Sequence, residues 1–239
     1  MRSKKHADYL AAIRRMTVGF DKSDPPTLER RWGAVLTVDV VEYSRLTILN
    51  GELAYFLYKS HRHELVDPKL REYGARFFKS TGDGIMAEFE TALDAARCAV
   101  DVQRGMIKRC RSTAKDSQVV FRMGLSCGPI MADIEDIYGH DINVAARLQT
   151  ISPPGGIAMT NEVAARVQSA LPVQLEDIGE QYFHNMGCPV HVFQCRFPDA
   201  PVTQRKRKKR RDQGRQQRRR AIDDAVSYAA FEGGSEGTE

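Results

Sequence analysis

FFKSTGDGIMAEF, residues 77–89, places two short runs of strand-forming residues on either side of a Gly-Asp-Gly turn. The turn cannot continue a regular element, and strand formers resume at Ile85, so the stretch predicts a β-hairpin. One ammonium group, Lys79, and one carboxylate, Asp83, lie at or beside the turn, where glycines let a ligand approach the backbone closely. The hairpin is therefore either part of a binding site or a surface feature whose polar tip is simply solvated.

Upstream of the hairpin, residues 34–41 form a nearly continuous run of apolar, mostly β-branched side chains. Such a run is typical of a strand that is buried on both faces. Asp39 interrupts the run, and burying its charge is costly unless a cation or hydrogen-bond donors compensate. Two interpretations stay open: Asp39 caps the helix that follows, or it binds a metal ion.

Further elements are predicted outward from these two stretches. Leucines at helical spacing indicate a helix from Ser44 to Val66, and Asp67-Pro68 is typical of the start of a second helix. Beyond the hairpin we expect a helix from Thr91, a strand over 119–125, a turn at 127–129, a strand over 130–134, a helix after an acidic loop, a strand over 157–160, a helix to about Leu171, and strands over 173–178 and 190–195. This order predicts an α+β fold with a ferredoxin-like β-α-β-β-α-β core and additional C-terminal strands and helix.

Charge is distributed unevenly along the 239 residues. Between Arg205 and Arg220, eleven of sixteen residues are Lys or Arg and one is Asp, so this run carries +10 and the rest of the chain −5. We expect an N-terminal extension with an amphipathic helix at 1–27, a folded domain at 28–198 and a disordered tail at 199–239. The basic run is either merely solvated or makes a weak, salt-sensitive contact with nucleic acid or an anionic membrane.

Composition argues against several classes of protein. No apolar run approaches the roughly 20 residues that a membrane helix needs, and the charged N-terminus lacks the pattern of a secretory signal. The five cysteines include no C-x-x-C pair, which argues against a disulfide framework or a zinc site. We therefore expect a cytoplasmic protein without a transmembrane segment.

Two pairs of polar residues suggest phosphate chemistry. Asp39 and Asp83 lie at predicted strand ends that are neighbours in a β-α-β-β core, so their carboxylates are expected to converge and hold Mg²⁺ beside phosphate oxygens. Two such ions can activate an attacking oxygen and neutralise a leaving one. Asn143 and Arg147 are four residues apart on a predicted helix, and this pairing suits a developing charge on phosphate. An ordinary solvated helix face is the alternative interpretation of that second pair.

Three motifs resemble the class III nucleotidyl cyclases, and most nearly the bacterial adenylate cyclase branch. They are AVLTVDVVEYSRL at 34–46, FFKSTGDGIMAEF at 77–89 and DIYGHDINVAARL at 136–148, in the order and at the spacing of the family. GEQYFHNMGCPVHVF, at 179–193, is also similar to the ends of domains in that branch. The resemblance covers approximately residues 30–197.

The resemblance implies a homodimer with its active sites at the interface. The reaction would be attack of the ribose 3′-oxygen of ATP on the α-phosphate, which gives 3′,5′-cyclic AMP and pyrophosphate. The implied roles are binding of two metal ions per site, Mg²⁺ or Mn²⁺, by Asp39 and Asp83, adenine recognition by Lys79 and Asp136, and transition-state stabilisation by Asn143 and Arg147.

The two residues assigned to the base favour adenine over guanine. Adenine has an acceptor at N1 and a donor at its 6-amino group, so Lys79 can donate to one and Asp136 can accept from the other. Guanine has the reverse pattern, which would leave polar groups unpaired. We therefore predict ATP as the substrate rather than GTP.

Three positions depart from the family pattern. Glu42 stands where the family usually has Gly, and a carboxylate there would crowd a triphosphate if it points inward. His184 stands where relatives often have Lys, and His is only partly charged at neutral pH. His140-Asp141 is an unusual pair, in which Asp141 suits a helix N-cap. Two alternatives therefore stay open: a nucleotide-binding regulatory module with weak or no cyclase activity, and a guanylate cyclase.

Overall fold

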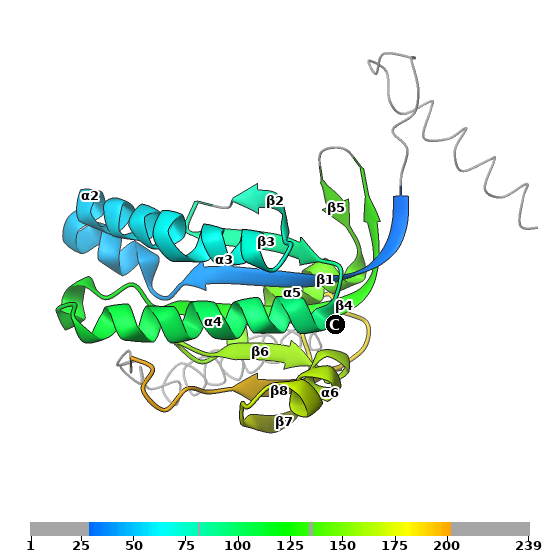
Figure 1. Ribbon diagram of the computed structural model, residues 1–239. Helices are drawn as coiled ribbons and strands as arrows, with labels where there is room; N and C mark the ends of the chain where they lie inside the picture. Colours follow the sequence, from blue (N-terminus) through cyan, green and yellow to red (C-terminus); the bar gives the residue numbers. More distant parts are fainter. Residues whose placement is uncertain (1–28, 81, 134–135, 202–239) are drawn as a thin grey trace, which may run out of the picture. The chain divides into compact units, whose positions relative to one another are not determined.

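The computed structural model describes residues 29–80, 82–133 and 136–201 (Figure 1). Its strands form one sheet in the order β2-β3-β1-β4-β6-β8-β7, and β5 pairs with β4 outside this order. The strands are β1 (Glu29–Val40), β2 (Arg76–Ser80), β3 (Gly84–Phe89), β4 (Phe121–Ala132), β5 (Ile137–Tyr138), β6 (Ile157–Thr160), β7 (Leu175–Gln181) and β8 (Val190–Cys195). The helices are α2 (Tyr43–His61), α3 (Asp67–Glu72), α4 (Ala92–Arg111), α5 (His140–Ile151) and α6 (Asn161–Ala170), with a π-helical turn at Arg62–Val66 and a 3₁₀ turn at Lys115–Ser117.

The first four strands form the predicted ferredoxin-like core. In the sheet they follow the order β2-β3-β1-β4, with α2 and α3 connecting β1 to β2 and α4 connecting β3 to β4. Strands β2 and β3 pair as the predicted hairpin, with a register shift between Phe77 and Lys79. The remaining elements, from β6 to β8, are the additional C-terminal strands and helix. The α+β prediction is therefore confirmed.

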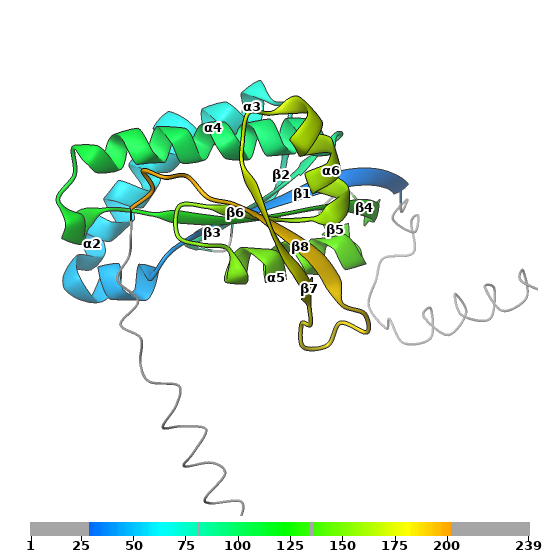
Figure 2. The same ribbon diagram turned by 90° about the horizontal axis from the view of Figure 1, so that it is seen from below.

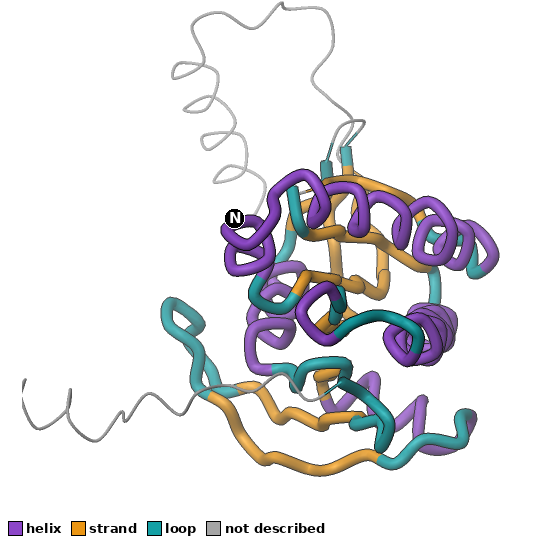
Figure 3. Tube along the Cα trace, turned by 90° about the vertical axis from the view of Figure 1, so that its left-hand side faces the viewer, coloured by secondary structure: helices purple, strands orange, loops and turns teal. Residues whose placement is uncertain are grey.

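Strand β1 lies between two different layers of side chains. Its even-numbered residues from Ala34 to Val40 are buried in a core that α4 shares, whereas Val35 is buried in a smaller cluster with Ala145 of α5. Figure 2 shows α3, α4 and α6 on one side of the sheet and α5 on the other, and Figure 3 gives the same arrangement from the side nearest α2. Because both faces of β1 are covered, its sequence is a nearly continuous apolar run.

Strand β4 is longer than the sequence indicates. The predicted turn at 127–129 is wrong, because β4 continues from Phe121 to Ala132 and pairs with β1 throughout. Beside Pro129, between the pairings with β6 and β5, the other edge of β4 has no strand partner among the described residues. A proline is tolerated at such a place because no partner strand requires its missing N–H.

Helix α2 is not the single regular helix that the leucine spacing predicts. Asn50 has φ −161° and ψ 97°, which are not helical angles. The side-chain oxygen of Asn50 accepts a hydrogen bond from the amide of Leu53 at 3.0 Å, as an N-cap does. The chain therefore begins a second helical segment within α2.

Two predicted helix starts have different outcomes. Thr91 is the N-cap of α4, where its hydroxyl oxygen accepts a hydrogen bond from the amide of Asp94 at 3.1 Å. Asp141 is not the N-cap of α5, because Gly139 occupies that position and Asp141 lies in the first turn.

Some predictions fall on parts of the chain that the structure does not describe. Residues 1–27 and the tail beyond residue 201, including the basic run at 205–220, lie outside the described residues. The division of the chain at residues 28 and 198 therefore stays a prediction. Within the described ranges, no helix is both long enough and apolar enough to cross a bilayer.

The turn from β1 to α2 holds a glutamate in the left-handed region of backbone conformation. Glu42 has φ 54° and ψ 37°, where an L-residue is strained by about 1 kcal/mol or more. Its carboxylate pairs with Arg45 at 3.2 Å, and exposed pairs of this kind contribute little to stability. A strained backbone position, Glu42, therefore follows the predicted metal ligand Asp39 by three residues.

We expect Glu42→Gly to raise the free energy of unfolding by about 0.5–1 kcal/mol. Glycine adopts the left-handed conformation without strain, and this gain exceeds the added entropy of the unfolded chain. Urea unfolding measures the change. Asn185, with φ 64°, is the matched control, because Asn tolerates this region and Asn185→Gly should change the free energy by a few tenths of a kcal/mol at most. Equal effects of the two substitutions would contradict the assignment of strain to Glu42.

Candidate active site

The structure brings Asp39 and Asp83 together at one end of the sheet. In the β1–β3 ladder Asp39 lies opposite Gly84, the residue that follows Asp83. Burial raises the pKa of the Asp39 carboxyl, and the negative charge of Asp83 adds to that rise. The register of β1 and β3 therefore places the two residues at the same end of the sheet, as predicted.

Arg122 of β4 compensates the charge of Asp39. It lies opposite Asp39 in the β1–β4 ladder, and its Nε and Nη2 atoms donate to Asp39 Oδ2 at 2.9 and 2.7 Å. Burial raises the pKa of Asp39 above its usual value, and the bonds from Arg122 oppose that rise. Asp39 does not cap α2, whose N-cap position is Glu42. The capping interpretation is therefore wrong.

Sequence reasoning missed Arg122, although a signal for it exists. Within residues 119–125, which the alternation predicts as a strand, Arg122 is the only charged residue. A single Asp on one buried strand and a single Arg on a neighbouring strand indicate an ion pair between the two strands. Only the register shows that the two residues face each other.

The donor set at this end of the sheet fits Mg²⁺ or Mn²⁺. Within the described ranges, no group of three or more His, Cys, Asp and Glu side chains is placed to hold a metal ion. Mg²⁺ is typically bound by one or two carboxylates together with substrate phosphates, which is what Asp39 and Asp83 would supply with a nucleotide present. These two residues are therefore the candidates for metal binding.

Helix α5 presents Asn143 and Arg147 on its outer side. Both side chains are exposed, whereas Val144, Ala145 and Leu148 of the same helix are buried. Among the ion pairs between described residues, none involves Arg147, so its guanidinium is available to an anion. The predicted common face of the pair is therefore present, on the side of α5 that points away from the sheet.

The two residues assigned to the base lie in different parts of the fold. Lys79 belongs to β2 and lies opposite Met86 of β3. Asp136 lies in the turn between β4 and β5, where its amide donates to Asp133 Oδ1 at 2.7 Å and its own Oδ1 accepts from the amide of Ile137 at 2.9 Å. These bonds fix the backbone and one oxygen of Asp136 at the end of the β4–β5 arm.

The loop that contains His184 is anchored beside α5. Phe183 and Met186, on either side of His184, pack against a cluster that includes Val144 and Leu148. His184 itself is exposed. The structure thus places this residue near the helix of Asn143 and Arg147, far from it in sequence.

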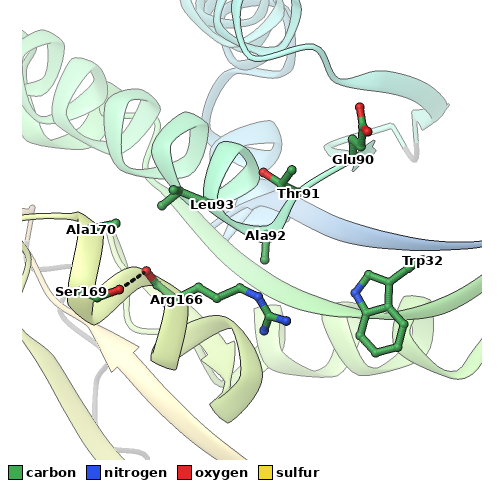
Figure 4. Close-up of a pocket in the computed structure, with 8 residues that line it drawn as sticks. All are labelled: Trp32, Glu90, Thr91, Ala92, Leu93, Arg166, Ser169 and Ala170. Carbon is green, nitrogen blue, oxygen red and sulfur yellow. Dashed lines mark hydrogen bonds between the residues drawn. The ribbon is translucent and has the colours of Figure 1, made fainter.

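A pocket of about 420 Å³ lies on the other face of the sheet (Figure 4). Trp32, the start of α4 and the end of α6 line it, and Figure 4 shows the guanidinium of Arg166 directed toward Trp32. A second pocket, of about 280 Å³, follows α2. Neither pocket is lined by any of the six candidate residues, so we assign neither to the candidate site.

Comparison with known proteins identifies the family of the folded region. Residues 34–192 match the family described as "Adenylate and Guanylate cyclase catalytic domain". A Rhizobium meliloti protein named "Putative adenylate cyclase 3" is 32% identical over 167 residues, which are 70% of this chain and 28% of that protein. An uncharacterized protein of Mycobacterium bovis is 31% identical over 120 residues, which are 49% of this chain and 39% of that protein. The chain thus spans well under half the length of these curated relatives.

Solved structures agree with the family match. The crystal structure of an adenylate/guanylate cyclase/hydrolase from Silicibacter pomeroyi has 36% identity and a TM-score of 0.68, and covers 74% of this chain and all of that one. The adenylyl cyclase CyaB from P. aeruginosa has 21% identity and a TM-score of 0.61, over 73% of this chain and 99% of that one, and shares the fold. With a family match over most of the folded residues, the chain belongs to the adenylate and guanylate cyclase catalytic domain family.

Proposed function

We propose that this chain is an adenylate cyclase that converts ATP to 3′,5′-cyclic AMP and pyrophosphate. The observation that supports this most directly is the convergence of Asp39 and Asp83 at the end of the β1–β3 ladder, in a chain of the cyclase family. A degenerate member of the family would have no need to keep two carboxylates at the same end of the sheet, since like charges repel each other.

The reaction assigns a separate task to each part of the site. The ribose 3′-oxygen attacks the α-phosphorus, the bond to the oxygen that bridges to the β-phosphate breaks, and the hydroxyl proton passes to water. Mg²⁺ or Mn²⁺ held by Asp39 and Asp83 would supply charge neutralisation and a more acidic 3′-hydroxyl. Arg147 and Asn143 would donate hydrogen bonds to the α-phosphate oxygens as negative charge develops there.

Selection of ATP rests on Lys79 and Asp136. An ammonium donor and a carboxylate acceptor complement N1 and the 6-amino group of adenine, and they mismatch the corresponding groups of guanine. A mismatch at buried polar groups lowers catalytic efficiency by about two orders of magnitude or more.

We propose further that the active site forms between two copies of the chain. Asn143 and Arg147 project from the side of α5 that faces away from the sheet, and so away from Asp39 and Asp83 of their own protomer. A second protomer facing this side would bring its own carboxylates to them. Each hairpin would then contribute to both sites, with Asp83 in one and Lys79 in the other.

Purified protein is expected to form cyclic AMP from ATP with Mn²⁺ or Mg²⁺, and to use GTP at least about 100-fold less efficiently. Asp39→Asn and Asp83→Asn should each lower kcat at least about 100-fold, because each removes a metal ligand. Glu176→Gln is the control. Glu176 lies on β7 and forms an exposed ion pair with Arg196, and the kcat of this variant should stay within about twofold of wild type.

The same assay separates the alternatives. Preference for GTP would identify a guanylate cyclase, and ATP binding in calorimetry without turnover would identify a regulatory module. Wild-type protein that makes no cyclic nucleotide with Mn²⁺ at high ATP contradicts the proposed function.

Mixed dimers test the shared site. Asp83→Ala and Lys79→Ala should each be nearly inactive alone, whereas an equal mixture should recover about a quarter of wild-type activity. Half of randomly formed dimers are mixed, and each mixed dimer has one intact site of two. Asp39→Ala mixed with Asp83→Ala is the control and should recover nothing, since both changes damage the metal-binding half of a site. Recovery in neither mixture, although mixed dimers form, would show that each site lies within one chain.

Glu42 provides the observation that favours reduced activity as a second candidate. Its carboxylate lies in the turn directly after the predicted metal ligand, and only Arg45 is paired with it among the described ion pairs. We expect Glu42→Gly to raise kcat/KM for ATP several-fold, on the order of 1 kcal/mol of transition-state binding. Glu42→Gln separates the causes: it removes the charge and keeps the strained backbone. If neither variant changes kcat/KM, the carboxylate does not contact the nucleotide.

A further inference from the structure

Helix α5 lies directly on the backbone of β4. A Cβ atom added at Gly124 would come within 2.1 Å of the carbonyl oxygen of Ala145 and within 2.4 Å of the backbone nitrogen of Gln149. Both contacts are with helix backbone, which cannot rotate away as a side chain can. The helix is therefore as close to the strand as the absence of a side chain at Gly124 allows.

Two hydroxyl groups of the sheet bind the carbonyl groups on the underside of α5. Thr37 Oγ1 is within 2.9 Å of the carbonyl oxygen of Ala145 and 3.3 Å of that of Gly124. Ser126 Oγ donates to the carbonyl oxygen of Asp141 at 2.6 Å. Both hydroxyl-bearing residues are buried, so these contacts are shielded from water. The two carbonyl groups are one helical turn apart, which fixes the position of α5 along the sheet as well as its height.

The same contacts link α5 to β1, the strand that carries Asp39. Thr37 lies two residues before Asp39 on β1, and therefore on the same face of that strand. Burial raises the pKa of the Asp39 carboxyl, and the side chain of Gln149, one turn beyond Ala145, is near enough to oppose that rise. Asn143 and Arg147 project from the opposite side of this helix. Any change in the distance between α5 and β4 therefore moves both residues relative to the sheet of their own protomer, and so relative to a second protomer that faces them.

We propose that Gly124 and Thr37 are positioning residues for the cyclase reaction. They set the placement of Arg147 and Asn143 by fixing where α5 packs on β4. This inference rests on the proposed function. Gly124 acts by admitting the helix backbone, and Thr37 acts by binding the carbonyl oxygen of Ala145. Neither residue touches the nucleotide.

Gly124→Ala requires the backbone of α5 to retreat by about 1 Å, and a displacement of that size at catalytic groups can lower kcat about 100-fold. Thr37→Val keeps the size of the side chain and removes the donor, and should lower kcat about tenfold. Thr37→Ser keeps the donor and should remain within about threefold of wild type. KM for ATP should change less than about threefold in all three variants, because the metal-binding carboxylates stay in place.

Gly128→Ala is the matched control on the same face of β4. A Cβ atom at Gly128 would also come very close to α5, but to the carboxylate of Asp141 at 2.0 Å rather than to helix backbone. That side chain can rotate away, so kcat should stay within about threefold of wild type.

A double-mutant cycle distinguishes positioning from general damage to the fold. If Gly124 and Thr37 act through Arg147, then Gly124→Ala and Thr37→Val should each lower kcat by less than about twofold in the Arg147→Ala background. Effects that multiply with that of Arg147→Ala would overturn the proposal, as would Thr37→Ser being as slow as Thr37→Val.

Crystal structures of the two variants decide the question without turnover. They should show the Ala145 carbonyl farther from β4 in Gly124→Ala and its bond to residue 37 lost in Thr37→Val, with the sheet unchanged. An unmoved α5 in Gly124→Ala would overturn the proposal. If the wild-type protein is inactive but α5 is displaced in Gly124→Ala, the proposed function is contradicted. The role of Gly124 in placing α5 on β4 is then still supported.

Discussion

Strand β1 is paired along one edge with β3 and along the other with β4, and both ladders extend to Asp39. The arrangement of the candidate site depends on these two registers. One ladder places Gly84, and with it Asp83, beside Asp39, and the other places the guanidinium of Arg122 there. A slip of one residue in β1 would turn Asp39 toward the apolar core, where its charge would have no partner. The apolar residues of β1 therefore specify the register that the carboxylate requires.

The two faces of the sheet differ in their composition and in their role. The face toward α4 is filled by the large apolar cluster, which supplies most of the buried apolar surface. The face toward α5 holds a small apolar cluster and several polar side chains, among them Asp39, Thr37 and Glu88. Glu88 is buried, and its two carboxylate oxygens accept hydrogen bonds from Arg31 at 2.7 and 2.6 Å. Because one face stabilises the fold, the other can accommodate charges and close backbone contacts that would be unfavourable in a core.

Sequence patterns predicted the elements that have a strong local signal. The hairpin has glycines at its turn, α4 has a capping threonine, and β1 has an apolar run, and each of these is present in the structure. The family resemblance, which rests on three motifs, is confirmed by the match over residues 34–192.

The failures of sequence reasoning have a common physical cause. Cys127, Gly128 and Pro129 suggest a turn when only neighbours in sequence are considered, but in the structure they lie in a strand on which a helix packs closely. The pairing of Arg122 with Asp39 depends on the register between two residues that are 83 apart in the sequence. Contacts between distant residues decide these features, and no local pattern contains them.

The packing of α5 on β4 affects how the sequence of such a domain can change. The height of the helix above the sheet is set by main-chain atoms, which every amino acid has, and by the absence of a side chain at one position of β4. Apolar residues in the large core can therefore change in size without moving α5 relative to β4. Changes in the core and a fixed position of α5 are compatible, because the strand between them contacts the helix through backbone atoms.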